Sequence, residues 1–346
     1  MPSFPGGNNT FIPSFEASGK LQIEFSRNPE SFPLNRYVGI KTVDKSIGRY
    51  LNITAEEASR VANQADYTWS DGQDAPGGMD GTEDFEFRSF TTERFAFPFR
   101  IGDKAIQQAD WDVLASHARI HAQKAMTNRT LSALDILTTI GSWPTNNTDT
   151  ATNLGGGFWS AATSINQFIL KTMDSVKEQI HLATQGAVPP EALRMVVSPK
   201  LAHTMRETDE IIDYVKQNAT ALQTIAGNQF FERWGVPNML YGVKLVVEDT
   251  VITTSRKGAA TLARDYEMKE QEAFFTAVTE GLENSREPAE GAPTFNTMTL
   301  FVFEDMTIES KRDDDARRTV ARVVDDFDSV LTAGASGFLI TEVVAP

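Results

Sequence analysis

Two of the four histidines in this 346-residue chain have a spacing that suggests metal chemistry. His117 and His121 lie four positions apart in a helical pattern, so both would point to one side of a helix, as in a zinc hydrolase. That motif also needs a glutamate directly after the first histidine, and position 118 is an alanine. The pair therefore predicts exposed or half-buried helix histidines and no metal centre.

Other segments carry incomplete motifs for binding or catalysis. Three glycines at 155–157 are followed by Phe158-Trp159, whereas a P-loop continues with Lys-Ser or Lys-Thr. Acidic clusters at 313–315 and 325–328 lie around several arginines and lack the glycine and closing glutamate of a calcium loop. The chain has no cysteine and no Gly-x-Ser-x-Gly elbow. We therefore predict no catalytic residue, cofactor or metal, and a salt-bridged surface at the acidic clusters.

The composition excludes two classes of function. The chain has 47 acidic and 32 basic residues and a formal net charge of −15, which argues against gripping nucleic acid through a broad basic face. No apolar stretch reaches the roughly 18–20 residues that a transmembrane helix needs. The N-terminal residues lack the basic and apolar regions of a signal peptide. We therefore expect folding in the cytosol.

The first hundred residues predict extended structure. Residues 1–46 contain five prolines, which block a long helix, and Leu21, Ile23 and Phe25 alternate with polar residues as in a strand. Residues 47–101 predict a long hairpin with a turn-rich tip. An arm and a hairpin of this length cannot bury themselves, so each needs another part of the protein or a neighbouring subunit; the alternative for the arm is disorder.

The returning half of the hairpin is unusually aromatic. Phe85 and Phe87, and then Phe95, Phe97 and Phe99, recur every second residue, which places the rings of each run on one face of a strand. Two strands cannot cover so much aromatic surface. The pattern leaves two partners open, the subunit's own core and a neighbouring subunit.

The remaining chain predicts an α+β protein with long helices first and strands gathered late. Residues 103–140 carry one helical pattern, with Asp103 as its N-cap; unbroken, it would be roughly 57 Å long, which is long for a compact domain, so an interruption at Asn128 or Thr130 is the alternative. Ser164 and Gln167 form a capping box for a second helix. Residues 193–197 read as a buried strand, and Ser198-Pro199 opens a further helix.

This order of parts resembles the major capsid protein of tailed double-stranded DNA bacteriophages, with the HK-ninety-seven type of fold that encapsulin shells share. Phrase-like segments support the resemblance along most of the chain. They are Leu34-Asn35-Arg36-Tyr37-Val38, residues 44–51, residues 90–95, Ala109-Asp110-Trp111-Asp112, and Trp234-Gly235-Val236-Pro237 running into residues 241–244.

The resemblance implies a division into named parts. They are an N-terminal arm at 1–46, an E-loop hairpin at 47–101, a peripheral (P) domain with a spine helix at 102–157 whose strands are completed by 292–312, an axial (A) domain at 158–291, and a C-terminal segment at 313–346 that returns to the A/P core.

The resemblance also implies a structural, non-enzymatic function. Copies of the chain would assemble as hexamers and pentamers into an icosahedral viral head that encloses DNA without reading its sequence, formed in the host bacterial cytoplasm and not in a membrane. Separate scaffold, portal and decoration proteins would be further partners, and replacing Phe95 and Phe97 with serine would weaken assembly. The implied contacts between subunits are Phe25, Tyr37, Trp69, Phe85, Phe87, Phe90, Arg94, Phe95, Phe97 and Phe99.

Some features depart from that family, and alternatives stay open. No lysine lies between Lys45 and Lys104, so the lysine–asparagine cross-link of some members is not expected here. The chain begins almost directly with the arm, so we expect scaffolding from a separate protein or no scaffold at all. The alternatives are an encapsulin-like nanocompartment with an enzyme cargo, another phage structural protein such as a tail-tube or decoration subunit, and a cytosolic hydrolase that uses an acidic cluster.

Overall fold

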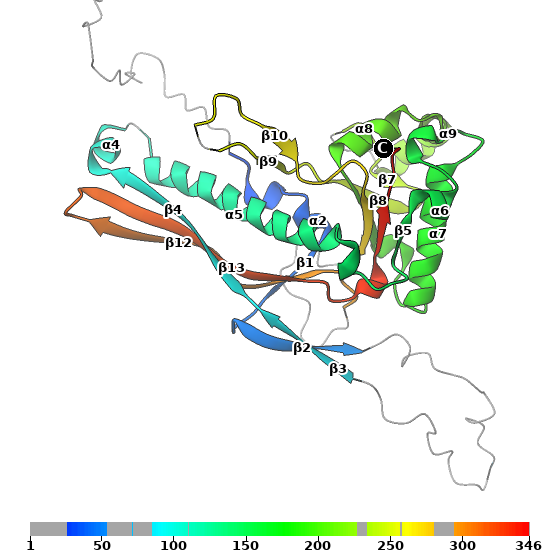
Figure 1. Ribbon diagram of the computed structural model, residues 1–346, viewed down its shortest axis with the longest axis horizontal. Coiled ribbons are helices and arrows are strands. Elements are labelled where there is room, and N and C mark those ends of the chain that lie inside the picture. The colour runs from blue at the N-terminus through cyan, green and yellow to red at the C-terminus, as the bar shows by residue number, and fades with distance from the viewer. Residues whose placement is uncertain are drawn as a thin grey trace, which may run out of the picture.

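The computed structural model describes residues 26–53, 71, 85–109, 111–226, 234–256, 258–279 and 294–345. Two sheets organise this part of the chain, joined by a long helix and by the segment around residues 26–38 (Figure 1). A two-stranded ribbon projects beside the first sheet. The predictions for residues 1–25, for the hairpin tip and for the short helix at 55–62 lie outside the described residues.

The first sheet has four strands in the order β1-β12-β13-β4. Its strands are β1 (Gly39–Thr42), β12 (Thr299–Asp313), β13 (Arg318–Val330) and β4 (Glu93–Gly102). The helix α5 (Val113–Leu137) lies along one face of this sheet (Figure 1). Alternation explains the packing, because Phe97 and Phe99 of β4 lie directly opposite Val323 and Ala321 of β13 and turn toward α5.

The predicted long helix is divided into two. A short helix α4 (Asp103–Gln108) ends before residues 109–112, and α5 begins after Asp112, whose side chain accepts a hydrogen bond from the backbone N–H of Ala115. Asp103 is therefore not the N-cap that the pattern predicted but the first residue of α4, and Gly102 occupies the cap position. The prediction of one helix over 103–140 is wrong at Ala109, Trp111 and Asp112, which lie outside both helices, and the interruption expected at Asn128 or Thr130 does not occur, because both residues lie within α5.

The second sheet has six strands in the order β5-β14-β11-β6-β8-β7. Its strands are β5 (Thr148–Thr150), β14 (Phe338–Thr341), β11 (Ala273–Ala277), β6 (Leu193–Val197), β8 (Val243–Val247) and β7 (Met239–Leu240). Four helices accompany it: α6 (Ala151–Gly155), α7 (Phe168–Ala183), α8 (Pro199–Glu207) and α9 (Asp209–Ala226) (Figure 1). A small hairpin of β9 (Val251–Thr253) and β10 (Arg264–Tyr266) follows β8.

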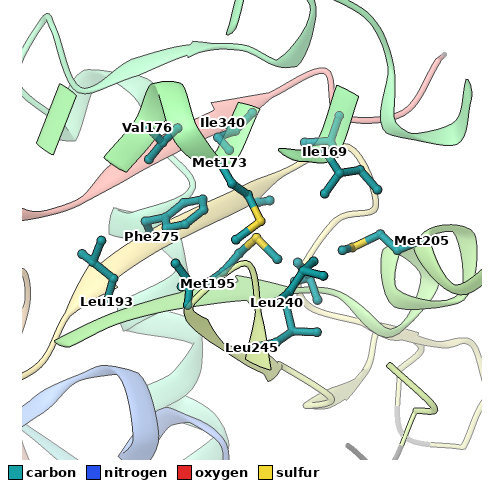
Figure 2. Packing of buried hydrophobic residues seen from close by; sticks show 14 of the residues in the cluster. Ile169, Met173, Val176, Leu193, Met195, Met205, Leu240, Leu245, Phe275 and Ile340 are labelled. Carbon is teal, nitrogen blue, oxygen red and sulfur yellow. The ribbon is translucent and has the colours of Figure 1, made fainter. Parts of the chain in front are cut away.

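The six-stranded sheet is buried on both faces. On one face Met195 and Phe275 pack against Met173 of α7, and Met173 and Met195 meet at the centre of this core (Figure 2). On the other face Val196 and Phe274 contact a second core. Burial on both faces explains why four of the five residues of β6 are apolar, while the fifth, Arg194, is also buried.

The second core joins the two sheets. It contains residues of α5 and of both sheets, and also the segment that holds the short helices η1 (Pro29–Ser31) and α2 (Leu34–Tyr37). Phe32, Leu34 and Tyr37 of that segment are almost fully buried. Residues 26–38, which we call the wedge segment, therefore pack between the six-stranded sheet and the helix α5.

The ribbon consists of β2 (Ile47–Ile53) and β3 (Phe85–Thr91), paired antiparallel. The predicted hairpin extended to residue 101, but residues 93–102 form β4, which pairs with β13 in the four-stranded sheet. The part of the hairpin that stands apart from this sheet is therefore the β2–β3 ribbon. The other predicted domain boundaries stay predictions.

Candidate inter-subunit surface

One face of the β2–β3 ribbon is apolar and exposed. In the register Leu51 lies directly opposite Phe87, so their side chains share a face, and Ile47 lies on the same face four residues earlier, with the Arg49–Ser89 pair between them. The side chains of Ile47, Leu51 and Phe87 are 66%, 47% and 66% exposed. We call Ile47, Leu51 and Phe87 the apolar ribbon face.

The opposite face of the ribbon rests on the four-stranded sheet. The ring of Phe90 stacks on that of Phe301 in β12 with centroids 4.3 Å apart and an interplanar angle of 4°. Tyr50 stacks on the same Phe301 ring at 5.6 Å. The same chain therefore covers this face at its root, and further out the face carries the exposed charged side chains of Arg88 and Glu86, so the exposed apolar residues lie on the other face.

Polar contacts hold the root of the ribbon. The backbone N–H of Thr91 donates to Oδ2 of Asp328 at 2.9 Å, and burial raises the pKa of Asp328. Arg94, the second residue of β4, donates to Asp326 and Glu304, both at 3.3 Å. These contacts come from β12 and β13, so the direction of the ribbon depends on strands far away in the sequence.

The structure corrects several predicted contact residues. Tyr37 is 0% exposed and donates a hydrogen bond to Glu248, so it belongs to the subunit's own core. Phe90 and Phe99 are 7% and 6% exposed because Phe301 and α5 cover them. Side chains this deeply buried cannot form the contact with a neighbour that the resemblance implied.

Phe95 and Phe97 also pack within the subunit. The Phe95 ring contacts that of Phe327 at 5.2 Å, and Phe97 lies against the core beneath α5. For these rings, the sequence left self-core and neighbour open, and self-core is what the structure shows. Serine at both positions is therefore expected to destabilise the subunit itself, so an assembly defect there would not be selective, and the effect on assembly stays a prediction.

The other predicted contacts have different outcomes. Phe87 and Arg94 are exposed and stay predictions. Phe25 and Trp69 lie outside the described residues, and only the backbone of Phe85 is described, in β3. Ile47 and Leu51 were not among the predicted contacts, because Arg49 lies between them on the same face and breaks the apolar alternation of the strand.

The two histidines pack against an aromatic ring. The Phe99 ring lies 5.7 Å from the His117 ring and 4.8 Å from the His121 ring. Burial, Lys124 and His117 lower the pKa of His121. Among the described residues no group of three or more histidine, aspartate or glutamate side chains has a geometry that could hold a metal ion.

The two acidic clusters differ in burial. Residues 313–315 are largely exposed and pair with Arg312 and Arg318, as predicted. Asp325 and Asp326 are almost fully buried, so the prediction of a surface segment is wrong there. Arg129 of α5 reaches both Asp325 and Asp305, which compensates the buried charge.

A buried glutamate links the wedge segment to the six-stranded sheet. Glu248, directly after β8, accepts hydrogen bonds from the hydroxyl of Tyr37 at 2.8 Å and from the backbone and hydroxyl of Thr250 at 3.0 and 2.5 Å. Burial, the largest cause, raises the pKa of Glu248. Arg27 reinforces the link through an ion pair with Asp249 at 2.7 Å.

This glutamate predicts a pH-dependent stability. A carboxyl group with a raised pKa stabilises the fold below about pH 4.5, its unfolded value, and that contribution is lost as the pH rises through the folded value. Glu248→Gln should remove this dependence, so the difference in unfolding free energy between wild type and variant should change by up to about 1.4 kcal/mol per pH unit within that window. Urea unfolding from pH 4.5 to 8 measures it.

The matched control is Glu207→Gln, at an exposed position on α8. Subtracting the unfolding free energy of each variant from that of the wild type at the same pH cancels the contribution of all other titrating groups. Wild-type and Glu248→Gln curves that stay parallel over the whole range would contradict the prediction.

Comparisons with solved structures agree on one fold. Neither a protein-family model nor a curated protein matches the sequence. A phage-related protein from Bordetella bronchiseptica superposes with a TM-score of 0.60 at 14% identity, over 91% of this chain and 94% of that one. The mature capsid of bacteriophage PhiM1 gives 0.50 at 13% identity over 99% and 96%, and the capsid of cyanophage P-SCSP1u gives 0.52 at 12% over 98% and 95%.

The likeness spans nearly the whole length of both chains in each comparison. It therefore covers both sheets, the spine helix and the ribbon together, and not one common substructure. None of the helices in the described residues is long and apolar enough to span a membrane. The chain has the α+β fold of tailed-phage capsid proteins.

Proposed function

We propose that this protein is the major capsid protein of a tailed bacteriophage, a structural and non-enzymatic subunit. Copies of the chain would assemble as hexamers and pentamers into an icosahedral shell around double-stranded DNA. The observation that carries the proposal is the apolar ribbon face, exposed on a projecting element of a chain with a capsid fold. An exposed apolar patch on a projecting strand pair is typical of a protein–protein contact.

The proposed contact is between the ribbon of one copy and the surface of the next. Ile47, Leu51 and Phe87 would become buried there, and the exposed guanidinium of Arg94 would lie at the edge. The net charge of −15 suits a container whose wall does not hold DNA tightly. The proposed location is the virion, with scaffold, portal and decoration proteins as proposed partners.

The test is the mass and shape of the purified protein, by light scattering and negative-stain microscopy on one fraction. We expect round or angular particles of megadalton mass, or hexamers and pentamers that convert to them. A species near 38.2 kDa that does not assemble with phage scaffold or in crowding salt would overturn the proposal. Shells from infected cells that hold an enzyme and no DNA would favour the encapsulin-like alternative instead.

A further inference from the structure

The ribbon meets the four-stranded sheet through a stack of three aromatic rings. Phe301 lies at the centre of this stack and is 3% exposed, with Phe90 and Tyr50 of the ribbon against it. Phe301 belongs to the part of β12 that pairs with β1, where it lies opposite Lys41. The ring that supports the ribbon therefore comes from a strand that is hydrogen-bonded to a neighbouring strand on each side, β1 and β13.

A glycine makes the stack possible. Gly48 lies directly opposite Phe90 in the register, and a Cβ atom placed on it would come within 2.4 Å of the Phe90 ring. Contacts that short do not occur, so any larger residue would displace the ring. Without a side chain at position 48, the Phe90 ring can lie across β2 and stay parallel to Phe301.

Small changes at this root would be amplified along the ribbon. The backbone of Thr91 is held by Asp328, and the N–H of Thr92 donates to the carbonyl of Ser46 at 2.8 Å. From Phe90 back along β3 to Phe87 the ribbon extends about 10 Å at 3.3 Å per residue. A rotation at the stack would therefore move Leu51 and Phe87 by several ångströms, while Ile47, next to Gly48, would move little.

We propose that Phe301 is a positioning residue, a pivot on which Phe90 and Gly48 fix the angle of the ribbon and so present the apolar ribbon face to a second copy of the chain. This inference rests on the proposed function, because it assigns a role in assembly. It also makes a claim about the isolated subunit that can be tested without assembly.

The test uses Gly48→Ala, which displaces Phe90 while leaving the residues of the apolar ribbon face unchanged. The chain has no cysteine, so Ser89→Cys on the ribbon and Lys124→Cys on α5, both exposed, can carry a pair of spin labels. We expect a narrow distance distribution in the otherwise wild-type subunit and a shifted or broadened one with Gly48→Ala. In unlabelled protein the concentration needed for assembly should rise about tenfold or more.

The matched control is Gly141→Ala, because a Cβ at Gly141 meets nothing within 4 Å. It should keep both the wild-type distances and wild-type assembly. A second variant, Phe301→Leu, should broaden the distances in the same way, and circular dichroism with thermal unfolding checks that each variant is folded.

The outcomes separate the pivot from the proposed function. Wild-type distances in folded Gly48→Ala would overturn the pivot, and so would broadened distances with wild-type assembly. If the wild-type chain does not assemble under any condition but Gly48→Ala still changes the distances, the proposed function fails while the pivot within the subunit is supported.

Discussion

Replacing Arg129 with methionine is expected to lower the free energy of unfolding by about 3–5 kcal/mol. The Arg129 side chain is 4% exposed and connects the spine helix to β13 and β12. Its Nε donates to Oδ2 of Asp325 at 2.9 Å. Its Nη2 donates both to Oδ1 of the same carboxylate and to Oδ1 of Asp305, the latter at 2.9 Å. Without Arg129, the fully buried Asp325 would lose its compensating charge.

The pH dependence of this variant follows from the same burial. Burial raises the pKa of Asp325 even with Arg129 beside it. Removing the guanidinium removes an interaction that lowers this pKa, so the loss in stability should grow as the pH rises and the buried carboxylate ionises. Urea unfolding followed by circular dichroism at pH 5 and pH 8 measures both the loss and its direction.

The matched control is Arg322→Met, which removes an exposed ion pair from β13, the strand that also carries Asp325. Arg322 pairs with Glu309, but its side chain is 57% exposed, so its loss should cost about 0–1 kcal/mol. The double variant Arg129→Met with Asp325→Leu replaces the buried pair by apolar groups and should recover most of the stability. An Arg129→Met variant no less stable than Arg322→Met would contradict the prediction.

Elements defined by local signals were predicted well. The strand β6 begins and ends at the predicted residues, Leu193 and Val197. The next helix starts as predicted, because the Ser198 side chain accepts from the N–H of Leu201 and Pro199 occupies the first turn. The helix start depends on a contact three residues away, and the strand, although it pairs with the distant β8 and β11, is marked by its own apolar composition.

Elements that depend on distant partners were not predicted. The capping box at Ser164 and Gln167 does not form: Gln167 has a φ of 49°, in the left-handed region, and makes no side-chain cap. The carboxylate of Glu210 in α9 instead accepts from the N–H groups of Ile169 and Leu170. A partner some forty residues away satisfies the helix start, and no local pattern reveals it.

The same reasoning explains the result for the candidate site. The period of two correctly grouped the rings of β4, but it cannot tell which surface they meet, and α5 covers them. Asp325 reads as a surface residue until Arg129, 196 positions away, is placed beside it. The sequence therefore indicated an aromatic hairpin that needs a partner, while only the packing shows which face is left uncovered.

The second large effect is expected on assembly, from substitutions in the exposed apolar ribbon face. Replacing Leu51 and Phe87 together with serine should leave a folded subunit that assembles poorly. Both side chains are exposed in the single chain, so the unfolding free energy should change by about 1 kcal/mol or less. Burying the exposed parts of both side chains against a neighbour would contribute about 2–3 kcal/mol per contact.

The free energy lost per contact determines how far the protein concentration needed for assembly rises. A loss of about 2–3 kcal/mol per contact should raise the protein concentration needed for assembly about thirtyfold or more, measured by light scattering across a dilution series. The matched control Leu51→Met with Phe87→Leu keeps the face apolar and should assemble almost normally, because an apolar contact depends on buried area and not on one particular shape. Shells formed by the double serine variant at wild-type concentration would show that the apolar ribbon face is not covered by a neighbour, and the contact between copies would then have to lie on another surface.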